Sequence, residues 1–183
     1  FSPPPPPPPP PPLMLAPHSF SHVYASHVLE HGGWQQGAQA LREWRRVLKR
    51  GGALSLAVPD TAALAGLLLA ATSPRHVPRA RGHGEEDSNE TYDDDDDDED
   101  EERDAVAATV LTVLYGAQRD LTDYHRAGYT ETILRRELEA AGFCGVVRVK
   151  GFHRFSGDST TLEVLGTPIS LNLEAVACGD LSQ

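Results

Sequence analysis

Two histidines and a glutamate lie within five residues of one another, in the segment His27-Val28-Leu29-Glu30-His31. This spacing matches the His-x-x-Glu-His pattern of inverted zinc proteases. Two histidines four residues apart share one face of a helix, where both imidazoles can bind zinc. A zinc site needs at least a third protein ligand, however, and none is evident in the sequence. Because the pattern is short and directly follows a predicted strand, we expect no metal here.

Small and polar residues also lie at the ends of two predicted strands. Ala25, Ser26 and His27 end the first strand, and Pro59 and Asp60 follow the second. In open α/β sheets, ligands bind outside the carboxyl ends of the strands, and small residues let a ligand approach the backbone. We therefore expect these two strand ends to border a binding site.

The elements around these residues form a predicted strand–helix–strand unit. Ser21–Ser26 reads as a short strand, and residues 53–58 are nearly all apolar, as in a parallel strand buried on both faces. The helix between them has an apolar stripe made of Leu41, Trp44 and Leu48. Lys49 and Arg50 are expected in its last turn, and Gly51-Gly52 is expected to end it. The spacing is that of a βαβ unit.

Three more helices and three more strands are predicted downstream. The helices are expected at 61–71, 105–115 and 131–141, and the strands at 146–152, 161–165 and 169–177. Thr61, Asp104 and Thr130 are the expected N-caps of the helices. We expect the last two strands to form an antiparallel hairpin at the end of an otherwise parallel sheet.

Two low-complexity segments interrupt this pattern. Pro3–Pro12 is an unbroken proline run, which adopts polyproline II geometry. Glu85–Asp104 holds 15 acids and one arginine, a density of like charge that favours a solvated chain. The expected organisation is a polyproline arm at 1–17, a βαβ part at 18–71, a disordered acidic insertion at 72–104 and a C-terminal part at 105–183.

Composition excludes several classes of protein. The net charge of −11 comes from the acidic segment, and the rest of the chain carries +3, so we expect no nucleic-acid partner. The most apolar run, Ala62–Ala71, is too short to span a bilayer, and we expect no membrane contact. Cys144 and Cys178 are expected as reduced, partly buried thiols of an intracellular, cytoplasmic protein.

Six segments occur in an order that resembles a known family. They are Tyr24–His31, Leu41–Gly52, Leu54–Pro59, Asp123–Thr130, Ala141–Phe143 and Gly166–Ala177. Together they resemble the second half of a class I AdoMet-dependent methyltransferase of the methyltransferase type 11 group. Arg50 stands where that family usually has proline.

The resemblance implies an α/β fold with a partial Rossmann-like sheet, made of strands four to seven with an antiparallel C-terminal hairpin and lacking the first half. It implies that Ala25, Ser26 and His27 border the methionine part of S-adenosyl-L-methionine. Pro59 and Asp60 would face the methyl acceptor, an unidentified small molecule or protein. His125 and Tyr129 are the candidate catalytic residues, although structural roles are commoner for such residues.

The donor side of the family's site has no counterpart in the sequence. No Gly-x-Gly-x-Gly loop precedes Ser26, nor does an acidic residue in position to hold the ribose. We therefore expect a truncated or degenerate methyltransferase that binds S-adenosyl-L-methionine weakly or not at all. The alternative is a non-catalytic interaction module, with a polyproline-binding protein on the proline arm and a basic partner on the acidic segment.

Overall fold

Among the described residues, strands and helices alternate up to residue 72, and two helices and then four strands follow. The computed structural model describes residues 13–73, 95–120, 122–155 and 157–178, with the backbone alone for 95–98. The proline run therefore lies outside the described residues. The strands are β1 (Phe20–Ser26), β2 (Leu48–Pro59), β3 (Phe143–Val149), β4 (Glu163–Val164), β5 (Thr167–Pro168) and β6 (Ser170–Ala177). The helices are α1 (Trp34–Val47), α2 (Thr61–Thr72), α3 (Asp95–Tyr115) and α4 (Glu131–Ala140), with 3₁₀ turns η1 (Leu29–His31) and η2 (Ser159–Thr161).

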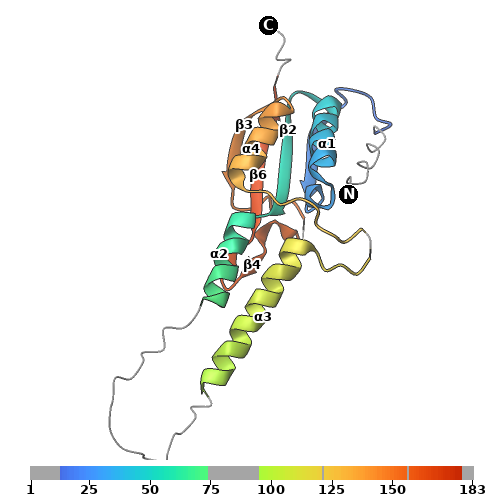
Figure 1. Ribbon diagram of the computed structural model, residues 1–183. Coiled ribbons are helices and arrows are strands. Elements are labelled where there is room, and N and C mark those ends of the chain that lie inside the picture. Colours follow the sequence, from blue (N-terminus) through green and yellow to red (C-terminus); the bar gives the residue numbers. More distant parts are fainter. Residues whose placement is uncertain (1–12, 74–94, 121, 156, 179–183) are drawn as a thin grey trace, which may run out of the picture.

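Four strands form one mixed sheet in the order β1-β2-β6-β3 (Figure 1). β1 and β2 are parallel, with Tyr24 opposite Ser55 and Ser26 opposite Ala57. β6 lies between β2 and β3 and is antiparallel to both. The α/β class and the parallel first pair are as the sequence predicted. The predicted hairpin is only partly present, because β4 pairs with β5 while β6 joins the main sheet.

The helix α1 ends earlier than predicted. It stops at Val47, so Lys49 and Arg50 lie in β2 and not in the last turn of the helix. Leu48 is fully buried and already extended, which makes it the first core residue of the strand. Gly51 does take the left-handed conformation (φ +74°), but inside β2, where the register against β1 shifts.

Side-chain N-caps begin the helices α2 and α4. Asp60, and not Thr61, caps α2, because its carboxylate accepts hydrogen bonds from the main-chain nitrogens of Ala62 and Ala63. Thr130 caps α4 as predicted. β3 starts at 143 and not at 146, because the chain turns directly into the strand after α4, at Gly142 (φ +90°).

Two helices cover one face of the sheet and build the main core. α1 and α4 lie side by side over the strands (Figure 1). Their fully or nearly fully buried leucines are Leu41, Leu134 and Leu138, which pack on Leu54, Leu56, Leu171 and Leu173 of the sheet. A smaller second core joins α2 to α3 through Leu64, Val110 and Ile169. Among the described residues no helix combines the length and apolarity needed to cross a bilayer.

Part of the predicted disordered insertion is helical. α3 begins at Asp95, so residues 95–104 are helical, and Asp104 lies inside the helix instead of capping it. Acidic residues are favourable at a helix N-terminus, because the helix dipole is positive there. Arg103 also binds the main-chain oxygens of Ala71 and Ser73 at the end of α2, which fixes this part of the helix.

The two cysteines are joined, contrary to the prediction of free thiols. Cys144 in β3 and Cys178 after β6 form a disulfide, with Cα atoms 5.8 Å apart. The antiparallel pairing of β3 with β6 places Cys144 opposite Val176 and brings the two thiols together. The sequence could not show this neighbourhood, because β3 was not predicted to pair with the last strand. Reduced thiols were one reason to expect an intracellular, cytoplasmic protein, and the disulfide removes that reason.

Candidate functional site

The carboxyl end of β1 is bound to a later part of the chain. The Ser26 hydroxyl lies 2.9 Å from the hydroxyl of Ser159 in η2. His27 Nε2 lies 3.1 Å from the Ser170 hydroxyl, which donates to the Ser159 main-chain oxygen at 2.9 Å. Ala25 is buried in the core. The polar side chains of the predicted cofactor-binding residues are thus held by serines from the C-terminal region.

His27 turns the chain from β1 into η1. Its φ of +52° is in the left-handed region, which is uncommon for a residue other than glycine. After this turn the Glu30 side chain is only 1% exposed. A carboxylate this deeply buried needs a positively charged or hydrogen-bonding neighbour.

Three histidines surround the Glu30 carboxylate. Its Oε1 lies 3.4 Å from His27 Nδ1 and 4.0 Å from His125 Nε2. The rings of His31 and His125 meet edge to face, with centroids 4.7 Å apart. One ligand atom from each of Glu30, His31 and His125 lies within 4.8 Å of the others. We call these three residues with His27 the Glu30 cluster.

Main-chain hydrogen bonds bring His125 to this cluster from a distant part of the sequence. The Glu30 main-chain oxygen accepts from the nitrogens of Arg126, at 2.8 Å, and Ala127, at 3.1 Å. The His125 nitrogen donates to the oxygen of Tyr115 at the end of α3, at 3.0 Å. The connection between α3 and α4 is therefore fastened to η1.

The His125 imidazole is held neutral by its surroundings. Burial lowers the pKa of His125, and although Glu30 acts to raise it, His31 and His27 lower it further. A neutral imidazole keeps a lone pair on one ring nitrogen, which can accept a proton or bind a metal.

Tyr129, the other predicted catalytic residue, is a core side chain. It is 2% exposed, and its ring meets that of Trp34 with centroids 5.2 Å apart. Burial raises the pKa of Tyr129 to about 12. The phenol therefore keeps its proton at neutral pH, which favours a structural role over that of a base.

The predicted acceptor-side residues are engaged within the protein. Asp60 is 3% exposed, and while one carboxylate oxygen caps α2, the other accepts from Arg148 at 2.7 Å. Arg148 also donates to Glu131 at 3.2 Å. Pro59 is buried opposite Ser170 in the sheet. Asp60 thus has a clear structural task at the strand end.

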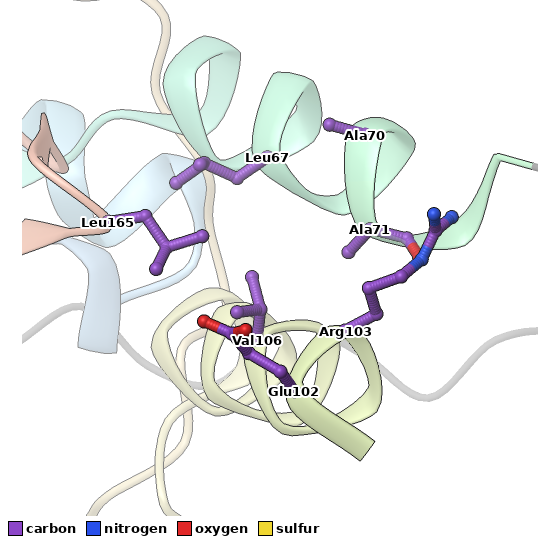
Figure 2. A pocket seen from close by; sticks show the side chains of 7 residues that line it. All are labelled: Leu67, Ala70, Ala71, Glu102, Arg103, Val106 and Leu165. Carbon is purple, nitrogen blue, oxygen red and sulfur yellow. The ribbon is translucent and has the colours of Figure 1, made fainter. Parts of the chain in front are cut away.

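The residues of the Glu30 cluster line neither of two cavities in the described part of the chain. One of about 290 Å³ opens between α2 and α3, where Leu67, Val106 and Leu165 point toward one another and Arg103 lies at the rim (Figure 2). The other, of about 570 Å³, lies near the end of β3, with Arg148, Lys150 and Ser170 in its wall. Only the second is adjacent to a predicted site residue, because Ser170 in its wall is hydrogen-bonded to His27.

A family comparison matches the part of the chain that carries the first strand end. Residues 12–56 match the family model described as a methyltransferase domain. This segment is methyltransferase-like. It covers β1, η1, α1 and much of β2, including Ala25, Ser26, His27 and Glu30. The methyltransferase resemblance predicted from Tyr24–His31 and Leu41–Gly52 is confirmed, while the later motifs lie outside the matched segment. No match was found among curated proteins.

Solved structures give weaker similarities. The CurJ carbon methyltransferase has 16% identity and a TM-score of 0.42 over 90% of this chain and 31% of its own. A possible exported protein from Bordetella parapertussis has 14% identity and a TM-score of 0.49, over 91% and 42%. A SAM-dependent methyltransferase from Archaeoglobus fulgidus has 12% identity and a TM-score of 0.46, over 89% and 62%. The chain spans less than two thirds of the length of each.

The sequence alone did not connect His125 with the histidines at the end of β1. The His-x-x-Glu-His spacing identified His27, Glu30 and His31 as a set, but the next member lies beyond α3. Only the tertiary fold shows that the connection between α3 and α4 returns to η1.

Proposed function

We propose that this chain is the acceptor-side part of an AdoMet-dependent methyltransferase domain, which transfers a methyl group to an unidentified small-molecule or protein acceptor. One observation carries the proposal. The parallel pair β1 and β2, joined by α1, lies largely within the segment that matches the methyltransferase family model. Ser26 and His27 are at the carboxyl end of β1, where ligands bind in open α/β sheets.

In this proposal, β1, β2, β3 and β6 correspond to strands four to seven of the family's sheet. The adjacent parallel pair fits the fourth and fifth strands, and an antiparallel β6 inserted beside β2 fits the end of the sheet. β1 is at the edge of the described sheet, since its ladder is with β2 alone. An edge strand with free main-chain groups is able to pair with further strands.

Methyl transfer requires the donor sulfonium and the acceptor nucleophile to be held close and in line. A base is needed only when the acceptor must lose a proton before it attacks. His125 is the stronger candidate for that base, because its imidazole is neutral and its side chain is 12% exposed. Tyr129 holds its proton too tightly, and its buried ring supports the fold.

We further propose that this chain by itself holds S-adenosyl-L-methionine weakly. The glycine loop that lets a backbone approach the cofactor has no counterpart before Ser26. The Ser26 and His27 side chains are also occupied by Ser159 and Ser170.

Saturation-transfer NMR with S-adenosyl-L-methionine tests this function. We expect saturable binding with a Kd above about 10 μM, displaced by S-adenosylhomocysteine. Ser26→Trp should abolish it by filling the strand end, whereas His18→Gln, at the other end of β1, should leave it unchanged. No saturable signal at about 1 mM ligand, or full binding by Ser26→Trp, would contradict the proposal. Calorimetric binding tighter than about 10 μM would contradict the weakness of the site.

The interaction-module alternative has less to support it. The proline run is outside the described residues, and the described end of the acidic segment forms the start of α3. No contact among the described residues identifies a partner for either segment.

A further inference from the structure

Unpartnered buried polar atoms concentrate in the Glu30 cluster. Across the described part of the chain, seven buried side-chain nitrogens and oxygens have no hydrogen-bond partner. Four of the seven are Oε1 and Oε2 of Glu30, Nδ1 of His31 and Nδ1 of His125. Buried polar atoms in proteins are nearly always hydrogen-bonded, so a cluster of exceptions needs an explanation.

The kinds of atom in the cluster point to a cation. An ionised carboxylate has only acceptor oxygens, and a neutral imidazole has one ring nitrogen with a free lone pair. An imidazole N–H could donate to the Glu30 carboxylate, but no such hydrogen bond is present among the described residues. A metal ion would bind the carboxylate and one lone pair from each imidazole at once.

The spacing is close to that of a metal site. The ligand atoms of Glu30, His31 and His125 lie within 4.8 Å of one another. Zinc ligands in a tetrahedral site lie about 3.3 Å apart, because each is about 2.0–2.1 Å from the ion. Side-chain rotations that move each atom inward by about 1 Å close this difference. His27 Nδ1 lies 3.4 Å from Glu30 Oε1, which is close to the spacing of two ligands of one ion.

We propose that Glu30, His31 and His125 bind one divalent transition-metal ion, of which zinc is the best match, with His27 beside it. Imidazole together with a carboxylate suits zinc and its neighbours in the first transition series. Magnesium and calcium prefer sites made of oxygen atoms. Three protein ligands that leave a further position open are the pattern of zinc sites that take part in chemistry.

The cluster is also accessible to an ion from solvent. The side chains of His27 and His125 are 19% and 12% exposed, while Glu30 is 1% exposed. The carboxylate is thus at the closed end of the cluster and two imidazoles are at its open side. The sequence predicted no metal because it lacked a third ligand, and His125 supplies that ligand through the fold.

This inference goes beyond methyl transfer and stands without it. The alternative to a metal is an ion pair, in which a protonated His27 or His125 neutralises Glu30. A bound ion would also take the His125 lone pair that proton transfer requires, so metal binding and a base role for His125 exclude each other.

The test is zinc binding by the full chain after removal of metals with a chelator. We expect calorimetry in the presence of excess Mg²⁺ to give one Zn²⁺ per chain with a Kd below about 1 μM. The magnesium saturates weak carboxylate sites on the acidic segment, because it prefers oxygen ligands. Cobalt in place of zinc should give visible absorption bands of a low-symmetry site with nitrogen ligands.

Three variants assign the site. Glu30→Gln and His125→Gln should each weaken zinc binding by about 100-fold or more, since loss of a ligand exceeds the 10–100-fold effect of losing a supporting residue. His18→Gln removes an exposed histidine at the other end of β1 from the cluster and should bind zinc as the parent does. Thermal melting separates misfolding from ligand loss, because metal-free Glu30→Gln should melt no lower than the metal-free parent, having lost a buried carboxylate that has no hydrogen-bond partner.

Two results would overturn the proposal. One is the absence of zinc binding at about 100 μM by a chain that melts cooperatively. The other is unchanged zinc affinity in Glu30→Gln and His125→Gln, which would place the ion elsewhere. Neither result bears on the binding of S-adenosyl-L-methionine at Ser26, so this proposal and the proposed function fail separately.

Discussion

Gly37 in α1 leaves the space that the Tyr129 hydroxyl occupies. A Cβ atom on Gly37 would lie 2.5 Å from the Tyr129 hydroxyl oxygen, closer than atoms of side chains approach. Tyr129 is 2% exposed and its ring packs on Trp34, so it has little room to move. This one contact fixes how closely α1 approaches the segment that precedes α4.

We expect Gly37→Ala to destabilise the fold by roughly 1–3 kcal/mol, because it overpacks this contact. An alanine would otherwise stabilise a helix by up to about 1 kcal/mol relative to glycine. Tyr129→Phe in the same chain should recover most of the loss, since the clashing atom is gone. The measurement is urea denaturation of the parent, both single variants and the double variant. A double variant no more stable than Gly37→Ala would contradict the contact.

The raised pKa of Tyr129 predicts a loss of stability at high pH. The pKa is about 12 in the folded chain and about 10 in an unfolded one. Between these values the unfolded state gives up the phenol proton and the folded state keeps it, so stability falls as the pH rises from about 10 to 12. The full difference is about 3 kcal/mol, at about 1.4 kcal/mol for each pKa unit.

Tyr129→Phe is the control for this pH dependence. It removes the titrating group and should flatten the additional fall in stability between pH 10 and 12, while other groups titrate alike in both chains. Equal slopes for the parent and the variant would show that Tyr129 is not protected from ionisation.

Local signals in the sequence predicted much of the fold. The apolar run at 53–58 became the buried centre of β2, and Thr130 caps α4. These features depend on residues within a few positions of one another, where capping and hydrophobic pattern act. The predicted end of α1 was a few residues too late, because a glycine such as Gly51 adopts a positive φ in a bulge as readily as at a helix end.

Non-local features could not be predicted in the same way. The insertion of β6 between β2 and β3 depends on how strands pair across long sequence distances, which alternation of polar and apolar residues does not specify. For the same reason, the sequence did not predict that His125 lies near Glu30 or that Cys144 lies near Cys178. The first pair comes together because the connection between α3 and α4 returns to η1, and the second because β3 pairs with β6.

Asp60 predicts a graded effect of substitution, because its two oxygens have different partners. One caps α2 and the other binds Arg148. Asp60→Asn keeps a capping oxygen but loses the charge, and we expect it to cost roughly 1 kcal/mol. Asp60→Ala also loses the cap, which adds roughly 1 kcal/mol. Thermal unfolding of the purified variants measures both.

Glu131→Gln is the matched control for Asp60. Glu131 binds the same arginine but at the surface, where ion pairs contribute about 0–1 kcal/mol. The expected order of stability is therefore Glu131→Gln, then Asp60→Asn, then Asp60→Ala. If Asp60→Asn and Asp60→Ala are equally stable, the cap contributes nothing and the role assigned to Asp60 is wrong.

The disulfide predicts that reduction destabilises the chain. It closes a loop across a sequence separation of 34 residues and fastens the end of β6 to β3. A cross-link over such a loop restricts the unfolded chain, and its loss should cost about 2–4 kcal/mol. Denaturant unfolding with and without reductant measures this cost.

The double variant Cys144→Ser/Cys178→Ser should have the stability of the reduced parent and no response to reductant. Thiol titration of the unreduced, unfolded parent should find no free cysteine, and two free thiols together with a parent that ignores reductant would contradict the cross-link.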